Sequence, residues 1–302
     1  MRRLAALAVG APVFLTRRYR PVPGVDRQYS ARAVRLVEET TVVDMLDQFR
    51  FADFAERPPR SERWLRVPRS FTREDYETYR TSGIRVLALG LGAGSYEDGL
   101  RFAADWNSFL AAYDEWFLRI DDVADFERVR RAGKVGIMLT LQGSDHFRTP
   151  ADVDTFFALG QRASQLTYNF ATRIGAGFLE NDDGGLTVFG GSIVERMNRV
   201  GMAVDASHCG DRTTLDALAA STRPVIFSHA SCRALLPGHR RCKTDEMIRL
   251  LAKGGGVMGI PMIRFMIRDR EPVTLGHVLD HVDHVARLVG IEHVGVGSDI
   301  DV

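Results

Sequence analysis

The sequence predicts an α/β protein of the TIM type, a (β/α)8 barrel. Short runs rich in β-branched residues alternate with longer amphipathic stretches from residue 41 onward, and the count of such runs reaches eight. This alternation indicates a parallel sheet with crossover helices, and eight units favour closure into a barrel. With 302 residues, 45% of them hydrophobic, the chain is long enough to bury the core of one barrel.

The eight expected strands are short, and several of them end in polar residues. They span residues 41–46, 84–91, 134–142, 163–169, 202–208, 223–229, 256–262 and 292–299. In a barrel the carboxyl ends of the strands meet at one rim, where barrel enzymes carry their functional side chains. Side chains at these ends are therefore the candidates for a site.

Two of the intervening helices have clear start and stop signals. Thr72, with Asp75 three residues later, forms a capping-box pattern, and Gly83 ends the helix. Thr274 opens a second helix with a continuous apolar face, and Gly290 ends it.

Residues 1–40 are expected to form an N-terminal arm with a first helix, and residues 41–302 a single barrel domain. The arm has a charged start and an apolar run at 4–15, which resembles a twin-arginine export signal without a clear cleavage site. A cytoplasmic arm explains the same residues, so both the cytoplasm and the periplasm remain open. The run is shorter than the roughly 20 residues that span a bilayer, and no transmembrane segment is expected.

The sequence stops at Val302, directly after the eighth expected strand. A barrel of this type normally continues with a helix that covers this strand and the first one. We therefore expect a barrel that lacks its last helix, as a shortened version of a longer protein. Residues 30–39 or a partner are the alternative cover for the exposed apolar surface.

Charge and cysteine content exclude several classes of protein. The 40 Lys and Arg against 39 Asp and Glu give a net charge of +1 without a basic stripe, so nucleic acid is not an expected partner. The three cysteines lack paired spacing, which argues against disulfides and a zinc ribbon. Cys209 adjoins His208 on a strand, where neighbours point to opposite faces, so the two are not expected to share a metal.

Two histidines are the strongest indication of a site. His208 ends the run at 202–208, and His229 ends the run at 223–229, one βα unit later. Two imidazoles and a carboxylate at neighbouring strand ends form a zinc site with one position open for water. The alternative is that each imidazole is a hydrogen-bonded core residue, but the rim position of both favours the metal site.

Other strand ends add polar candidates around the two imidazoles. Asp299 ends the last strand, and Gly295 and Gly297 on the same face leave room for backbone or ligand beside it. The remaining candidates are Asp44, Asp47, Gln142, Asp145, His146, Tyr168 and Asn169.

A loop with several cations follows the sixth strand. Arg241 is the candidate for bidentate binding of a substrate carboxylate, while Arg240 and Lys243 are expected on a solvated face. Three histidines at helical spacing precede the eighth strand, on a helix that packs outside the barrel, so structural or surface roles are expected for them. They are His277, His281 and His284.

Together these residues resemble the membrane, or renal, dipeptidase family of metallopeptidases. The resemblance runs from about residue 42 to residue 302 and depends on four separated motifs in the right order. They are DASH (205–208), IFSHAS (226–231), the arginine-rich loop followed by TDE (244–246), and HVGVGSDID (293–301). The resemblance implies a TIM-type barrel with two zinc ions that hydrolyses dipeptides, often as a homodimer.

The resemblance also implies roles for individual residues. His208 and His229 match the two histidine ligands of one zinc ion. Arg241 matches the arginine that holds the substrate carboxylate, and Asp299 matches the acidic residue that works as acid or base. Tyr168 stands where the family has a histidine that polarises the substrate carbonyl, and it can still donate a hydrogen bond.

Three departures from the family pattern concern the other zinc ion. The family's first strand carries Asp-x-His-x-Asp, but this sequence reads DMLDQ at 44–48, with Leu46 in place of the histidine and Gln48 in place of the second aspartate. Gln142 replaces the bridging glutamate, and a neutral amide is a poor bridge between two dications. We therefore expect one zinc ion rather than two, on His208 and His229, completed by Asp299, Gln142 or His146.

The first functional hypothesis is a metal-dependent hydrolase of a dipeptide or similar small amide with a free carboxylate. Zinc would activate the water, and Asp299 would move the proton. Arg241 would anchor the carboxylate, and Tyr168 or Asn169 would stabilise the oxyanion.

Two alternatives remain. The first is a catalytically inactive barrel that keeps the fold and binds a small ligand or a partner. The second is metal-free hydrolysis with Ser207 or Ser231 as nucleophile, which ranks last because no G-x-S-x-G motif is present.

Overall fold

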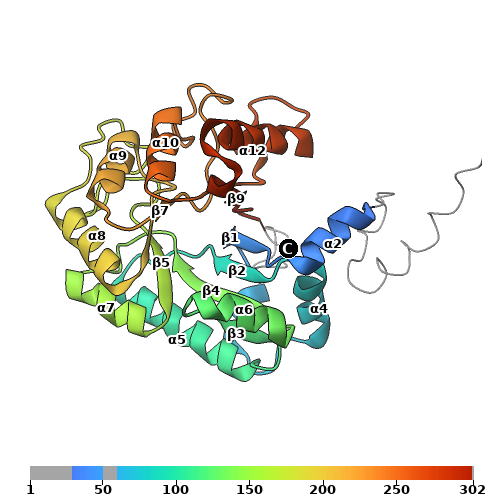
Figure 1. Cartoon of the computed structure of the whole chain (residues 1–302). Helices are drawn as coiled ribbons and strands as arrows, with labels where there is room; N and C mark the ends of the chain where they lie inside the picture. The colour runs from blue at the N-terminus through green and yellow to red at the C-terminus, as the bar shows by residue number, and fades with distance from the viewer. Residues whose placement is uncertain (1–28, 50–59, 301–302) are drawn as a thin grey trace, which may run out of the picture.

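The computed structural model describes residues 29–49 and 60–300, which form a ring of parallel strands with helices around it (Figure 1). The strands are β1 (Val43–Asp47), β2 (Val86–Leu89), β3 (Phe117–Arg119), β4 (Val135–Leu141), β5 (Gln161–Gln165), β6 (Ala203–Asp205), β7 (Val225–Ile226), β8 (Met258–Ile260) and β9 (Val294–Val296). Eight of them follow the order β7-β6-β5-β4-β2-β1-β9-β8. A parallel bridge from Phe227, directly after β7, to Met258 of β8 completes the ring. The predicted TIM-type barrel is confirmed.

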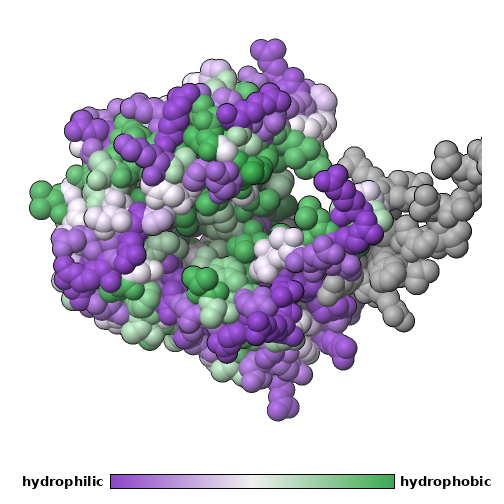
Figure 2. Space-filling view, viewed as in Figure 1, coloured by the Kyte–Doolittle hydropathy of each residue, from purple (hydrophilic) through white to green (hydrophobic). Residues whose placement is uncertain are grey.

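The helices lie outside the ring of strands (Figure 1). They are α2 (Ala31–Glu39), α3 (Arg60–Arg66), α4 (Arg73–Ser82), α5 (Tyr96–Ala112), α6 (Val123–Ala132), α7 (Pro150–Ala158), α8 (Val188–Val200), α9 (Asp211–Ala220), α10 (Asp245–Lys253), α11 (Arg264–Ile267) and α12 (Leu275–Val289), with a 3-10 turn at Ile291–His293. Figure 2 shows hydrophilic residues over much of their outer surface and hydrophobic residues toward the middle of this face. None of the helices within the described ranges is long and apolar enough to cross a membrane.

Both predicted helix signals are present. The Thr72 side chain accepts a hydrogen bond from the Asp75 amide, the Asp75 carboxylate accepts one from the Thr72 amide, and Gly83 ends α4 with a left-handed φ of 87°. Thr274 caps α12, and Gly290 follows its last residue. The export-signal pattern at residues 4–15 lies outside the described residues.

Strand β3 is an addition that the sequence pattern did not predict. It pairs with the first residues of β4, from Val135 to Ile137, while β5 pairs with the last ones, from Leu139 to Leu141. The two strands therefore share one edge of β4. The three residues of β3, Phe-Leu-Arg, include none of the β-branched residues on which the strand prediction depends.

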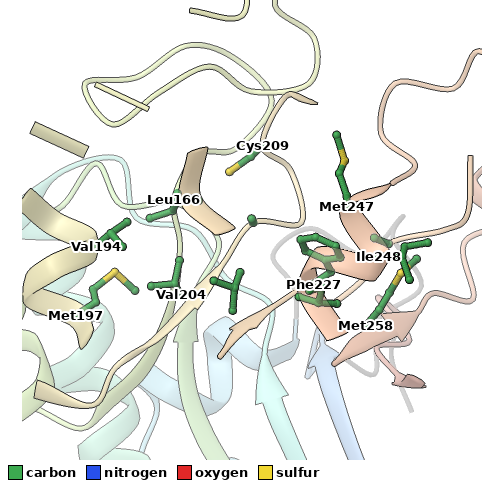
Figure 3. Close-up of a cluster of buried hydrophobic side chains, with 14 of the residues drawn as sticks. Leu166, Val194, Met197, Val204, Cys209, Phe227, Met247, Ile248 and Met258 are labelled. Atoms are coloured by element: carbon green, nitrogen blue, oxygen red, sulfur yellow. The ribbon is translucent and has the colours of Figure 1, made fainter. Parts of the chain in front are cut away.

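Two buried clusters hold the strand ends in place. Figure 3 shows the first, in which α8 and α10 pack on β6, β7 and β8. Its labelled members are Leu166, Val194, Met197, Val204, Cys209, Phe227, Met247, Ile248 and Met258. In the second cluster, Phe49 stacks on Tyr79 with ring centroids 4.3 Å apart and meets Trp106 edge-on at 5.1 Å. Because Phe49 follows β1 closely, this cluster fixes the carboxyl end of that strand.

Gly297 lies against the main chain that carries His229. A Cβ atom on Gly297 would lie 1.7 Å from the Ser228 carbonyl oxygen, whereas one on Gly295 would meet its nearest atom at an ordinary 3.4 Å. The room that the sequence predicted beside Gly297 is therefore taken by backbone.

Replacing Gly297 with alanine is expected to lower the free energy of unfolding by about 1–3 kcal/mol, the usual cost of overpacking a core. Chemical denaturation followed by circular dichroism measures the change. The matched control is Gly295→Ala, which is expected to unfold like the wild type. Equal denaturation midpoints for Gly297→Ala and the wild type would contradict the close contact.

Candidate metal and substrate site

The two predicted imidazoles meet beyond the ends of β6 and β7. Asp205 of β6 pairs with Ile226 of β7, and each histidine lies three residues after its member of this pair. The equal offset brings the Nε2 atoms of His208 and His229 to 2.9 Å, with both side chains buried. Parallel register thus explains why two residues 21 positions apart face each other.

The tautomer of His208 is set by Asn169. The amide oxygen of Asn169 lies 2.8 Å from the Nδ1 atom of His208, and an amide oxygen only accepts hydrogen bonds. Nδ1 therefore carries the proton, and Nε2 carries a lone pair.

The tautomer of His229 is set by Ser228 in the same sense. Ser228 donates its hydroxyl proton to the Asp205 carboxylate at 2.5 Å, so its oxygen accepts from Nδ1 of His229 at 2.8 Å. The Nε2 atom of His229 then also carries a lone pair. Lone pairs on two nitrogens 2.9 Å apart repel each other, and a cation bound by both nitrogens would remove that repulsion.

The surroundings disfavour a proton as that cation. Burial, followed by the nearby positive charge of Arg241, holds the pKa of both His208 and His229 well below the usual value. Both imidazoles are therefore neutral near pH 7, which is the form that binds a metal ion. The donor set fits one metal ion held by two imidazole nitrogens.

A third ionisable ligand does not join this pair. Among residues 29–49 and 60–300, no group of three or more His, Cys, Asp or Glu side chains is arranged to hold a metal ion. The structure therefore does not bring Asp299 or His146 to the two imidazoles as the expected completing ligand.

His146 lies elsewhere. Its ring packs against both Phe147 and Phe156, with centroid distances of 4.0 and 4.6 Å, and its Nε2 atom lies 3.1 Å from the Gln161 side-chain oxygen. Burial lowers its pKa to about 4. Gln161 begins β5, so His146 is a core residue at the opposite end of that strand from the site.

Asp299 follows β9 and is held from two sides. Gln48 donates a hydrogen bond to its carboxylate at 2.6 Å, and its own amide donates to the Leu46 carbonyl at 2.8 Å. Burial raises the pKa of this carboxyl, while the Gln48 hydrogen bond and the charge of Arg241 act in the opposite direction. From the sequence, Gln48 was evident only as the replacement of an acid, and its bond to Asp299 was not predicted.

Gln142 lies with Gln48 and Leu46 around Gly90. A Cβ atom on Gly90 would be 3.0 Å from the Gln142 amide nitrogen and 3.1 Å from the nearest side-chain atoms of the other two. The Gln142 amide donates to the Gly90 carbonyl at 3.0 Å. Two amides and an aliphatic side chain thus stand together where the family pattern has acids and a histidine, so this half of the rim carries no negative charge from them.

Arg241 is buried, with 2% of its surface exposed. Its guanidinium donates to the Ser207 carbonyl and, at 2.8 Å, to the His229 carbonyl. These bonds use two of five N–H donors and tie the two histidine segments together. Burial lowers its pKa to about 10, so the charge persists at neutral pH and is available to a carboxylate.

The sequence predicted that Lys243 lies on a solvated face, and this was wrong, because only 1% of Lys243 is exposed. Its ammonium donates to the carbonyls of Ala206 and Cys209 at 2.8 and 3.1 Å and to the Thr214 hydroxyl at 2.9 Å. Burial lowers its pKa to about 8. Arg241 and Lys243 lie in the loop before α10, and both side chains are buried there. Arg240 lies in a turn and is exposed, as expected.

Tyr168 covers the imidazole of His208. The two rings stack with centroids 4.4 Å apart and an interplanar angle of 20°, and 46% of Tyr168 remains exposed. Phe178 meets His208 edge-on at 5.9 Å, and the Arg241 guanidinium carbon lies 6.0 Å from the Phe178 ring centre. The phenol of Tyr168 thus stands at the solvent side of the site, where it can donate to a substrate.

The three histidines of α12 have structural roles, as predicted. His281 accepts from the Cys232 amide at 3.0 Å and donates to the Ile267 carbonyl at 3.0 Å. His284 pairs with Asp245 at 2.8 Å, and the remaining member of the set, His277, takes part in the cap of α12.

Comparison with known families and proteins gives a consistent result. The family model described as membrane dipeptidase (peptidase family M19) matches residues 90–302. Dipeptidase verJ of Clonostachys rogersoniana is 39% identical over 177 residues, which cover 57% of this chain and 45% of that protein. The uncharacterized dipeptidase C965.12 of Schizosaccharomyces pombe is 36% identical over 193 residues, covering 61% and 46%. The chain spans about half the length of these curated relatives.

Solved structures share the fold. An amidohydrolase from Pseudomonas aeruginosa superposes with a TM-score of 0.77 at 26% identity, covering 89% of this chain and 76% of that one. A metallo peptidase from Rhodobacter sphaeroides, liganded with a phosphinate mimic of the dipeptide L-Ala-D-Ala, gives a TM-score of 0.72 at 20% identity, covering 85% of each chain. At this identity the second similarity supports the barrel architecture alone.

Proposed function

The chain belongs to the membrane dipeptidase family, peptidase family M19, and from this premise we propose that it is a metal-dependent hydrolase of a dipeptide or a similar small amide. The observation that carries the proposal is the pair of imidazole lone pairs, which face each other at 2.9 Å and are each fixed by a hydrogen bond at Nδ1. Such a pair is built to bind a cation.

The proposed metal content is one zinc ion, on His208 and His229. When bound, zinc supplies Lewis acidity toward the substrate carbonyl and toward water. The neutral side chains of Leu46, Gln48 and Gln142 support one ion rather than two, because carboxylate charge is what holds a second dication in place. With only two protein ligands, we expect weak binding.

Two charged groups act on the substrate in this proposal. Arg241 binds the free carboxylate with the N–H donors that it does not use on the main chain. Asp299 accepts and returns the proton of the attacking water, since its raised pKa brings it closer to the range of a working acid and base.

Two further residues shape the site. Tyr168 donates a hydrogen bond to the carbonyl oxygen that becomes negative during the reaction. Asn169 was predicted for the same role. Its amide oxygen bonds the Nδ1 atom of His208 instead, and this bond supports a role for Asn169 in positioning that imidazole.

The second candidate function is a catalytically inactive barrel that binds a small ligand. The observation that favours it is the lack, within the described ranges, of a third His, Cys, Asp or Glu beside the two imidazoles. Assembly as a homodimer and the cellular compartment stay predictions.

A dipeptide screen tests the proposed function. The protein is stripped with a chelator and assayed against dipeptides with free and amidated carboxyl groups, before and after zinc is added. We expect turnover that needs zinc and is faster with the free carboxylate. Absence of turnover at saturating zinc would support the inactive barrel, and turnover that survives chelation would revive the metal-free route.

The pH profile gives a test of Asp299. Gln48→Met removes a hydrogen bond that favours the ionised carboxylate, so the pKa of Asp299 rises further. Because the reaction needs the ionised carboxylate, the variant loses activity on acidification at a higher pH than the wild type does. A bond to a charged group is worth about 1.5–3 kcal/mol, so the acid limb of kcat/KM is expected to move up by about one to two pH units.

The control for this profile is Gln142→Met. Its amide bonds the Gly90 carbonyl instead of a carboxylate, so the acid limb is expected to keep its position. An acid limb that stays in place in Gln48→Met as well would show that Asp299 does not set it.

A further inference from the structure

We propose that Asp205 is a positioning residue that, through Ser228, keeps His229 in the tautomer whose Nε2 lone pair faces His208. The inference rests on the proposed metal site, which this tautomer leaves open. The sequence assigned no role to Asp205, which is the first residue of the DASH segment.

The Asp205 carboxylate is buried and accepts four hydrogen bonds. Its Oδ1 atom accepts from the Ser207 amide at 2.9 Å, the Ser207 hydroxyl at 2.6 Å and the Ser228 amide at 3.2 Å. Its Oδ2 atom accepts from the Ser228 hydroxyl at 2.5 Å. Each carboxylate oxygen therefore has a fixed set of donors, and one oxygen is committed to Ser228.

These hydrogen bonds determine which atom is the donor and which the acceptor in the contact between Ser228 and His229. A serine hydroxyl has one proton, and the carboxylate takes it, so the Ser228 oxygen can only accept from the imidazole. The contact between the Ser207 and Ser228 hydroxyls is longer, at 3.1 Å, and Ser207 already donates to Asp205. The proton of His229 is therefore held on Nδ1.

Without Asp205 the same atoms would satisfy each other differently. Ser228 would be free to donate to Nδ1 of His229, and the imidazole proton would move to Nε2. That proton would form an ordinary hydrogen bond to Nε2 of His208, which lies 2.9 Å away. The two imidazoles would then close on each other, and the lone pair needed by a metal ion would be lost. Asp205 prevents this closure.

The substitution Asp205→Asn tests the chain of bonds because the orientation of the new amide is dictated. Three donors converge on the Oδ1 position, so the amide oxygen must occupy it. The amide NH2 group then faces Ser228, whose hydroxyl turns toward His229. We expect the proton of His229 to move from Nδ1 to Nε2.

Two readouts follow this change. Long-range 1H–15N NMR of the metal-free protein distinguishes the protonated ring nitrogen, and the signals of His229 are assigned by their loss in His229→Gln. Zinc titration of the whole chain gives Kd, which is expected to rise about 10- to 100-fold, the usual effect of losing a group that orients a metal-binding histidine. A proton that stays on Nδ1, or an unchanged Kd, overturns the proposal.

Ser228 provides variants that work even where Asp205→Asn fails to fold. Ser228→Ala removes the acceptor and is expected to give the Nε2 tautomer and the weaker Kd, whereas Ser228→Thr keeps the hydroxyl and is expected to restore the Nδ1 tautomer. Ser207→Ala is the matched control, since the Ser207 hydroxyl bonds Asp205 and the main-chain amide of His229 but not the imidazole ring, and it is expected to leave the tautomer unchanged. If the wild type binds no zinc, the proposed function fails, and the tautomer readout alone decides on Asp205.

Discussion

Replacing His229 with alanine is expected to abolish zinc binding and to lower kcat/KM for a dipeptide by at least about 100-fold. Loss of a group that only orients a metal ligand costs about 10- to 100-fold, so loss of the ligand itself costs more. His208→Ala is expected to have the same effect, because the two nitrogens face one position. Steady-state kinetics with added zinc measures the change in both variants.

His284→Ala is the control for these two variants. It removes an imidazole that pairs with Asp245 on the outside of the barrel, and zinc binding and turnover are expected to stay near wild-type values. Zinc-dependent turnover at the wild-type rate in His229→Ala would show that the metal is held elsewhere. Loss of turnover in His208→Ala and His229→Ala, with an intact fold, would exclude the inactive barrel.

Replacing Arg241 with methionine is expected to lower kcat/KM by about 30-fold or more for a substrate with a free carboxylate. Removing one partner of a buried charge pair costs about 2–5 kcal/mol, which corresponds to this loss. Methionine keeps much of the side-chain volume while it removes the charge and the N–H donors. The kinetics are measured on paired dipeptides with free and amidated carboxyl groups.

The paired substrates separate binding from structure. Arg241 also donates to the Ser207 and His229 carbonyls, so the variant loses main-chain support that affects both substrates equally. Only the carboxylate contact is specific to the free acid. We therefore expect the preference of the wild type for the free acid to disappear in Arg241→Met. An equal loss on both substrates would contradict the role of Arg241 as the carboxylate anchor.

The barrel was predictable because its strands and helix ends are marked locally. Alternation of β-branched runs and amphipathic stretches predicted the eight strands of the ring, and Thr72 and Gly83 bound α4 as the sequence indicates. The expected strands ran too far at their carboxyl ends, since polar residues such as His208 lie beyond the last paired residue. Strand β3 was not predicted because its three residues, Phe-Leu-Arg, include no β-branched residue.

Of the candidate site, only the residues at the ends of paired strands were predictable. His208 and His229 come together because their strands pair in register, which barrel topology implies. Lys243 was expected in solvent, since the sequence of a loop with several cations does not tell which of them is buried. His146 was expected at the rim, but the chain turns at Gly143, with φ 131°, and buries the imidazole against α7. Contacts of this kind depend on tertiary packing, which composition and spacing do not encode.

The partners that fix the two tautomers were also beyond the sequence. Asn169 and Ser228 were visible as polar residues near strand ends, but the direction of a hydrogen bond depends on what lies on its far side. For Ser228 that neighbour is Asp205, on a different strand. A pairing of this type becomes evident only when the register of β6 and β7 is known.

The central claim is that His208 and His229 hold one zinc ion. Zinc titration of the chelator-stripped protein, with elemental analysis of the zinc-loaded protein, tests this claim most directly. The arrangement of His208 and His229 predicts one zinc ion per chain, bound weakly because the charges of Arg241 and Lys243 oppose a dication, and lost in His208→Ala and His229→Ala. Two tightly bound zinc ions per chain, or one that survives in both variants, would contradict it.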